Sequence, residues 1–337
     1  MRWLERHWYR ITPLSFLLVP VSLVFLAAVA LRRALYRIGL LRVVRIPVPV
    51  IVVGNITAGG TGKTPLVAWL VGFLRAHGMR PGVVSRGYGG RHRTPAAVAA
   101  GGDAGSFGDE AVLLARICEG PVWIGHDRAA TARALLASAP ECTVIVSDDG
   151  LQHYRLGRDI EIAVVDGRRG AGNGFMLPAG PLREPGSRLG TVDAIVVNVS
   201  ESATVALKTV KPAAYAMTVS GTEFYNLLNP ERRVGPEYFR GRNVHAIAGI
   251  GRPDRFFQLL RRLGIDFTAH PFPDHYAYVA HDVSFPGADC VLMTEKDAVK
   301  CGRLAHERHW VLPVRAELDA AFGELILATL QKARHGS

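Results

Sequence analysis

The chain has 337 residues, of which 49% are hydrophobic and 20% are charged, and its formal net charge is +11. This length suits two domains of ordinary size, and this hydrophobic content excludes a disordered chain. The four cysteines, at positions 118, 142, 290 and 301, form no CxxC pair and are typical of free thiols in a reducing compartment.

The first 45 residues combine basic charge with an apolar segment. They contain eight arginines and one acid, and the 21 residues from Ile11 to Leu31 carry no charge. Such a run is long enough to cross a bilayer, and arginines beside it favour anionic lipid over nucleic acid. Because Pro13 and Pro20 interrupt the run, we expect residues 1–45 to form a membrane-associated, hairpin-like helical anchor. A secretory signal and an apolar core helix are the alternatives.

A glycine-rich loop follows the next predicted strand. The apolar run from Val48 to Val53 predicts a strand buried on both faces of a parallel sheet, and an apolar helix is predicted from Pro65. Strand, glycine loop and helix in this order predict a phosphate-binding loop, with Lys63 on the β- and γ-phosphates of ATP and the Thr64 hydroxyl on Mg²⁺. The predicted nucleotide-binding residues are Thr57, Ala58, Gly59, Gly60, Thr61, Gly62, Lys63 and Thr64.

The next predicted strand, Gly82–Ser85, leads into Arg86, and open α/β sheets bind ligands at such strand ends. Further along, Asp109 and Glu110 begin a predicted helix. They carry chemistry there, or they only stabilise the helix dipole.

Asp148 and Asp149 follow a second buried strand. An apolar strand that ends in acid is typical of the Mg²⁺-associated carboxylate of a phosphate-loop enzyme, and it is equally typical of a turn cap. The proline- and glycine-rich stretch 172–185 predicts a functional loop. His275, after Asp274, is either a general-base partner or an ordinary turn histidine.

The alternation of strands and helices predicts an α/β fold. Residues 46–210 are expected to form a kinase core domain with a P-loop NTPase-type, doubly wound parallel sheet. The pattern breaks at 211–241, which we interpret as a connector with a pair of strands as the alternative. Residues 242–337 are expected to form a smaller C-terminal α/β domain.

Seven unusual motifs occur between residues 53 and 300. They are VGNITAGGTGKTP (53–65), SRGYGG (85–90), FGDE (107–110), SDDGLQH (147–153), GPLREP (180–185), FPDHYAY (272–278) and TEKDAVK (294–300). In this order, behind a basic apolar N-terminus, they resemble the tetraacyldisaccharide 4′-kinase family of Gram-negative bacteria. The unusual Thr57 at the first loop position is in keeping with this family.

The resemblance implies that the γ-phosphate of ATP is transferred to the 4′-hydroxyl of a tetraacylated glucosamine disaccharide 1-phosphate, giving the lipid A precursor lipid IVA. It implies a lipid substrate, contact with the cytoplasmic face of the inner membrane, and neither nucleic acid nor an obligate protein partner. The residues implied are Asp109, His275 and Lys63 in catalysis, Thr64, Asp148, Asp149 and Glu184 around Mg²⁺, and Arg86 and Gln152 in the substrate pocket.

Two expectations concern how the site works. FGDE implies that Asp109 acts at the attacking hydroxyl, and FPDHYAY implies that His275 pairs with it. Because these two residues fall in different predicted domains, we expect the site to form by closure about the connector at 211–241.

Other functions compete with a lipid kinase. A membrane-associated P-loop ATPase of the partitioning or site-selection type shares the GGTGKT core, but that group carries a lysine where this chain has Ala58. A non-catalytic nucleotide-binding adaptor at the membrane would use its acids only as caps. A nucleic-acid enzyme is disfavoured, because the basic charge gathers at an apolar segment.

Overall fold

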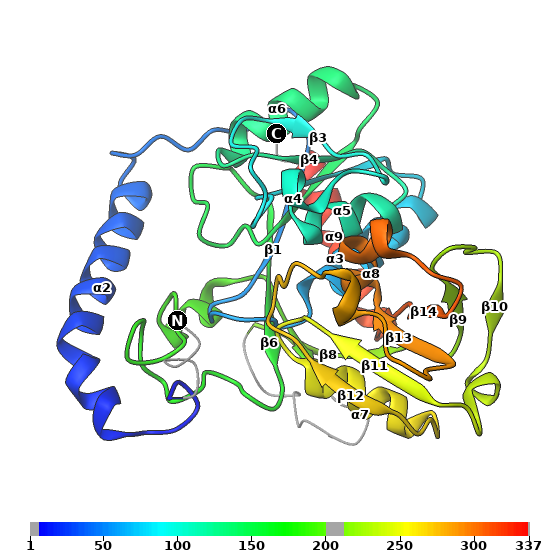
Figure 1. Cartoon of the computed structure of the whole chain (residues 1–337). Helices are drawn as coiled ribbons and strands as arrows, with labels where there is room; N and C mark the ends of the chain where they lie inside the picture. Colours follow the sequence, from blue (N-terminus) through cyan, green and yellow to red (C-terminus); the bar gives the residue numbers. More distant parts are fainter. Residues whose placement is uncertain (1–6, 200–211, 336–337) are drawn as a thin grey trace.

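The computed structural model describes residues 7–199 and 212–335, so the predicted boundary at residue 210 lies outside the described residues. The strands form two sheets, one of nine strands and one of six. In Figure 1 the smaller sheet, in yellow and orange, lies beside the larger one, and helix α2 (Pro13–Arg37) stands apart from both.

The nine-stranded sheet is mainly parallel, as predicted. Its order is β15-β8-β7-β6-β1-β5-β2-β4-β3, with antiparallel pairing at the two edges, β15 with β8 and β3 with β4. The strands are β1 (Val50–Gly54), β2 (Pro81–Ser85), β3 (Ala96–Ala97), β4 (Val122–Ile124), β5 (Val144–Asp148), β6 (Ile160–Asp166), β7 (Ala194–Asn198), β8 (Ala214–Ser220) and β15 (Arg315–Leu318). Because parallel strands end at one edge, the loops after β1, β2, β5 and β7 gather there.

Helices cover both faces of this sheet, which explains the unbroken apolar strands. In β1, Ile51 and Val53 pack into one core, while Val50 and Val52 pack into the other. The first core also holds α3, α5 and α9, and the second holds α6. The helices other than α2 are α3 (Lys63–Ala76), α4 (Ala104–Phe107), α5 (Asp109–Ile117), α6 (Arg128–Ser138), α7 (Pro253–Arg262), α8 (Glu295–Cys301) and α9 (Ala320–His335).

The six-stranded sheet has the order β10-β9-β14-β13-β11-β12. Phenylalanines and leucines of α7 pack on one face of it, and α8 packs on the other. Its strands are β9 (Phe224–Asn226), β10 (Arg233–Val234), β11 (Val244–Ala248), β12 (Thr268–Pro271), β13 (Cys290–Thr294) and β14 (His309–Leu312). Short 3₁₀ helices are η1 (Gly186–Thr191), η2 (Pro236–Phe239), η3 (Ala280–Asp282) and η4 (Gly302–Leu304).

The predicted domain limits differ from the sheets at the C-terminal side. The segment 211–241, interpreted as a connector, supplies β8 to the large sheet and β9 and β10 to the small one. Residues 315–335, assigned to the C-terminal domain, return to the large sheet as β15 and α9. Tertiary packing decides this: Phe322, Ile326 and Leu330 fill the core beneath α3, and no local pattern in α9 states which sheet it will cover.

Within the described residues 7–45, the N-terminal segment forms one helix, so the predicted hairpin is wrong. Thr12 caps α2 through a capping box with Ser15, and Pro20 lies inside the helix without ending it. The sequence from 13 to 37 has no Gly, Asn or Asp at which a chain would turn back. Ser22 faces the body, where its hydroxyl donates to the Met176 carbonyl at 2.9 Å.

The remainder of α2 is largely uncovered. The helix is long and apolar enough to cross a membrane, and only 11% of its most apolar window is buried. This low burial argues against the alternative of an ordinary core helix. Large apolar side chains exposed between residues 16 and 31 are Phe16, Leu17, Val21, Leu23, Val24 and Leu31.

Candidate active site

The predicted phosphate loop connects β1 to α3 and is shaped by glycines in left-handed conformations. Gly59 has φ +103° and Gly62 has φ +95°, which side chains other than hydrogen rarely allow. A Cβ on Gly62 would lie 2.2 Å from the amide nitrogen of Asn198, at the end of β7. That amide donates to the Thr61 carbonyl at 2.9 Å, so β7 supports the loop from below.

The loop is also tied to its neighbours at the start. Ala58 donates its backbone N–H to the Pro181 carbonyl at 2.7 Å, which joins the loop to the GPLREP motif. Asn55 donates to the Gly59 carbonyl at 3.3 Å and accepts from Lys63 at 3.2 Å. The loop is therefore held in shape by the protein itself.

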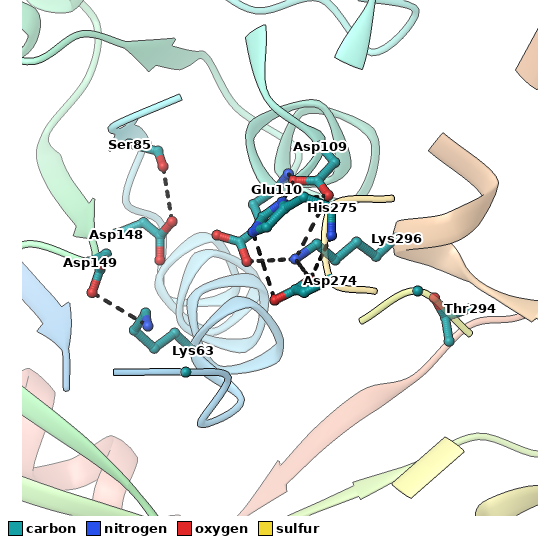
Figure 2. A network of polar contacts seen from close by, with 12 residues as sticks. Lys63, Ser85, Asp109, Glu110, Asp148, Asp149, Asp274, His275, Thr294 and Lys296 are labelled. Atoms are coloured by element: carbon teal, nitrogen blue, oxygen red, sulfur yellow. Dashed lines mark hydrogen bonds and ion pairs between the residues drawn. The ribbon is translucent and has the colours of Figure 1, made fainter. Parts of the chain in front are cut away.

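Lys63 lies beside Asp149, with Nζ 3.4 Å from the carboxylate (Figure 2). Arg183 reaches the same carboxylate at 3.2 Å. Burial acts to raise the pKa of Asp149, but the charges of Lys63 and Arg183 outweigh it and hold that pKa well below its usual range. Asp149 itself has φ +47°, in the left-handed region. The site therefore holds an ionised carboxylate against the phosphate-loop lysine, on a residue whose backbone is strained.

Asp148 ends β5 and is fully buried. The Ser85 hydroxyl donates to one of its oxygens at 3.0 Å, and the other oxygen has no partner among the described residues. Burial, followed by the charge of Glu110, raises the pKa of Asp148 to about 6. A buried acceptor without a partner beside a phosphate loop fits a cation, so Asp148 suits Mg²⁺.

The described residues contain no group of three or more His, Cys, Asp or Glu that could hold a metal alone. Mg²⁺ in phosphate-loop enzymes takes one or two protein ligands and completes its shell with phosphates and water, so the Thr64 hydroxyl and Asp148 fit this role.

Glu184 has different neighbours from those predicted for a metal ligand. Its buried carboxylate accepts from Gln152 at 2.8 Å and from the Tyr154 hydroxyl, and it pairs with Arg188 at 3.4 Å and with Arg33 of α2 at 3.9 Å. These donors already use its oxygens. The structure thus places Glu184 in an ion cluster beneath α2, where a local motif could not reveal it.

Gln152 and Arg86, which were both predicted in the substrate pocket, lie in different surroundings. The Gln152 amide donates to the Asn55 carbonyl at 3.1 Å and accepts from Arg183 at 3.3 Å, so it is engaged in bonds that support the phosphate loop. Arg86 is exposed at the end of β2. Its charge acts on His153, together with that of Arg128, which places Arg86 near a basic cavity.

That cavity has a volume of about 320 Å³ and lies between the end of α2, the start of α6 and the segment after β5. Arg128 at its wall is 2% exposed, and two of its guanidinium nitrogens have no partner among the described residues. Burial, followed by the charge of Arg128, lowers the pKa of His153 to about 3. The lining residues are Arg32, Tyr36, His126, Asp127, Arg128, Ala129, His153, Arg155 and Leu156.

Asp109 and His275 are in contact, 166 residues apart in sequence. The imidazole Nδ1 lies 3.0 Å from both carboxylate oxygens of Asp109, at the first residue of α5 (Figure 2). The hydrogen bond to Asp109 raises the pKa of His275 against the effect of burial. Burial would raise the pKa of Asp109, but His275 and the charge of Lys296 lower it. The pair is already formed in this structure, and the closure about the segment 211–241 stays a prediction.

Lys296 and Asp274, for which the sequence indicated no role, complete this cluster together with Glu110. Lys296 lies 2.9 Å from Glu110, 3.0 Å from Asp274 and 3.8 Å from Asp109. Figure 2 shows this network facing Lys63, Asp148 and Asp149 across the start of α3. The signal for it was the TEKDAVK motif, in which the role of Lys296 becomes clear only when α8 is packed against α5.

Known proteins of one family are similar to this chain. A family model for tetraacyldisaccharide-1-P 4′-kinase matches residues 14–331. Proteins named tetraacyldisaccharide 4′-kinase from Azoarcus sp. (strain BH72) and Methylobacillus flagellatus are 52% and 48% identical, over 97% and 98% of this chain and 95% and 96% of their own lengths.

A crystal structure of LpxK from Aquifex aeolicus in complex with ATP matches with a TM-score of 0.81 at 30% identity, over 94% of this chain and 99% of that one. It confirms the predicted fold class, and these matches do not favour the partitioning-type ATPase. The chain therefore belongs to the tetraacyldisaccharide-1-P 4′-kinase family.

Proposed function

We propose that this protein transfers the γ-phosphoryl group of ATP to the 4′-hydroxyl of a tetraacyldisaccharide 1-phosphate, yielding lipid IVA and ADP. The observation that carries the proposal is the Asp109–His275 pair facing the phosphate-loop residue Lys63 within one site (Figure 2). The names of the relatives supply the acceptor.

Lys63 and the loop amides serve the donor. When ATP binds, the Lys63 ammonium exchanges its contact with Asp149 for the β- and γ-phosphates, where it offsets the charge that develops during transfer. Asp148 and Thr64 would hold Mg²⁺, which neutralises phosphate charge and aligns the γ-phosphoryl group. Arg183 keeps Asp149 in place when the lysine moves away.

His275 serves the acceptor as the base. Its Nδ1–H donates to Asp109. Its Nε2, which lies 3.7 Å from an Asp274 oxygen and so outside hydrogen-bond distance, takes the proton of the 4′-hydroxyl as the oxygen bonds to the γ-phosphorus and ADP leaves. Asp109 itself is a poor base, since it is buried, ionised and low in pKa. We thus assign the proton to His275 and orientation to Asp109.

The basic cavity suits the 1-phosphate of the substrate. Arg128 offers buried, unpartnered N–H donors, and Arg32 of α2 faces the same space. A phosphate would satisfy both through charge-assisted hydrogen bonds. The cavity adjoins α2, so the sugar head and the membrane-facing helix share one side of the molecule.

The exposed apolar face of α2 suits the bilayer that holds the acyl chains of the substrate. We place the protein at the cytoplasmic face of the inner membrane, because ATP is available there, with α2 embedded in the membrane or lying at its surface.

The test is direct. The protein, ATP, Mg²⁺ and tetraacyldisaccharide 1-phosphate are incubated in detergent, and mass spectrometry should find a product heavier by one phosphate. The His275→Asn variant should bind ATP but form product about 10²- to 10⁴-fold more slowly. Folded wild-type protein that binds ATP and yields no product would overturn the proposal.

A further inference from the structure

We propose that Lys296 is a positioning residue for the acceptor half of the site: it holds the loop that carries His275 against the start of α5 and fixes the imidazole on Asp109. This inference rests on the proposed function. Lys296 touches neither the phosphate loop nor the basic cavity in the contacts described above, so it acts through its neighbours.

The backbone that carries Lys296 is fixed. Lys296 is the second residue of α8, which Thr294 caps by accepting the Asp297 N–H at 3.1 Å. Asp297 is fully buried and accepts the Gly249 N–H at 3.1 Å. The ammonium group is therefore presented from a rigid helix start of the small sheet.

This ammonium joins carboxylates from both sheets. Glu110 and Asp109 belong to α5 of the large sheet, while Asp274 belongs to the loop of the small sheet that carries His275. The Lys296 side chain is only 13% exposed. Because it is enclosed by carboxylates, its removal would leave several negative charges close together with little compensation.

The loop needs such support. His275 has φ +58°, a left-handed conformation that is strained for a histidine. Its backbone N–H donates to Asp274 at 3.1 Å, and the same carboxylate oxygen accepts from Lys296 at 3.0 Å. Lys296 thus holds the Asp274 carboxylate, and this carboxylate in turn holds the backbone of His275.

Lys296 also affects the charge on the imidazole. The groups facing His275 are Asp109 from α5, Asp274 from its own loop, Lys296 from α8 and the Tyr88 ring at 5.1 Å. The two carboxylates raise the pKa of His275, and Lys296 lowers it. A neutral residue at 296 should therefore raise that pKa further, so a base at position 275 would lose its proton only at higher pH.

The experiment compares pH profiles of kcat/KM for lipid phosphorylation in wild type, Lys296→Met and Lys296→Arg. We expect Lys296→Met to lower kcat about 10- to 100-fold, with the KM for ATP unchanged, and to move the acidic limb upward by about 0.5 to 1 pH unit. Lys296→Arg should keep the limb of the wild type.

Arg252→Met is the matched control. Arg252 is another buried cation that joins the two sheets, 2.7 Å from Asp166, but it is absent from the groups that face His275. If Lys296 only held the two sheets together, Lys296→Met and Arg252→Met would both lose activity, and the acidic limb of the pH profile would stay at the wild-type pH in both. That outcome would overturn the inference.

Two further results would also overturn it. One is a Lys296→Met enzyme with the pH profile and kcat of the wild type. The other is a protein in which Lys296→Met and Lys296→Gln both fail to fold while Lys296→Arg folds, because the role would then be purely structural. A wild-type protein without lipid kinase activity would instead refute the proposed function, before any variant is compared.

Discussion

The two halves of the site differ in how they are built. The donor half comes from one sheet: the phosphate loop, Asp148 and Asp149 follow two neighbouring strands, β1 and β5. The acceptor half needs both sheets, because Asp109 lies on α5 and His275 on a loop of the small sheet. A change in how the sheets pack would thus separate the acceptor pair, while the strands that carry the nucleotide site would stay together.

Different interactions therefore hold the two halves of the site in place. The donor half is held by short-range bonds within its own sheet, such as Asn198 to the Thr61 carbonyl. The acceptor half depends on ion pairs across the interface, around Lys296. Substitutions around Lys296 should accordingly affect the chemical step more than the affinity for ATP.

The largest effect is expected when the acceptor pair is broken. His275→Asn should lower kcat about 10²- to 10⁴-fold, since a general base is lost. Asp109→Asn should cause a loss of similar size, and the double variant should lose no more than the worse single variant, because the two act as one unit. Product formation measured by mass spectrometry checks this, and multiplicative losses would show that the two residues act separately.

A slightly smaller loss is expected in the donor half. Lys63→Met should lower kcat about 10²- to 10³-fold, because one positive donor to the phosphates disappears. Lys332→Met, on the exposed surface of α9, is the control and should retain the activity of the wild type. A Lys63→Met enzyme within tenfold of the wild type would remove the loop lysine from the mechanism.

The basic cavity should affect the lipid alone. Arg128→Met is expected to raise the KM for the lipid about 10- to 100-fold, the size of one or two lost charge-assisted hydrogen bonds. The KM for ATP should stay constant, because Arg128 lines the cavity and not the phosphate loop. Steady-state kinetics with each substrate varied in turn separates the two, and an equal rise in both KM values would contradict this assignment.

The mildest effect is on pH dependence. Asp109 raises the pKa of His275 above its ordinary value of 6.5, and the base must be neutral to accept a proton. Activity should therefore rise with pH through a midpoint above 6.5 and fall about tenfold per unit below it. The residual activity of His275→Asn should lack this limb; a midpoint below 6.5 in the wild type would contradict the raised pKa.

The raised pKa of His275 also determines how this residue changes the stability of the fold with pH. Since the folded pKa of His275 lies above the unfolded one, its pairing stabilises the fold fully below pH 6.5, and this contribution is lost as the pH rises through the folded pKa.

The donor half could be predicted well from the sequence, because its residues follow strands within single motifs. Lys63 and Asp149 meet in space since β1 and β5 are neighbours in a parallel sheet. The predicted α/β fold was confirmed for the same reason: apolar strands and helices alternate locally.

The acceptor half and its support were less accessible. From the residues alone, His275 was either a general-base partner or an ordinary turn histidine, because its neighbours in the sequence do not reveal that it contacts Asp109. The family resemblance indicated the catalytic role. Lys296 had no assigned role, and Glu184 was expected at a metal but lies among arginines below α2. Each of these depends on which surfaces pack together, which local periodicity does not encode.

The return of α9 to the first sheet has a consequence for synthesis on the ribosome. The core around β1 and α3 lacks Phe322, Ile326 and Leu330 until the ribosome has translated these residues of α9, far behind α3 in the sequence. Meanwhile α2 has long since emerged, with its apolar side chains uncovered. The apolar helix α2 is thus synthesised well before the last side chains of the catalytic core. If α2 binds the membrane as proposed, anchoring would precede completion of the core.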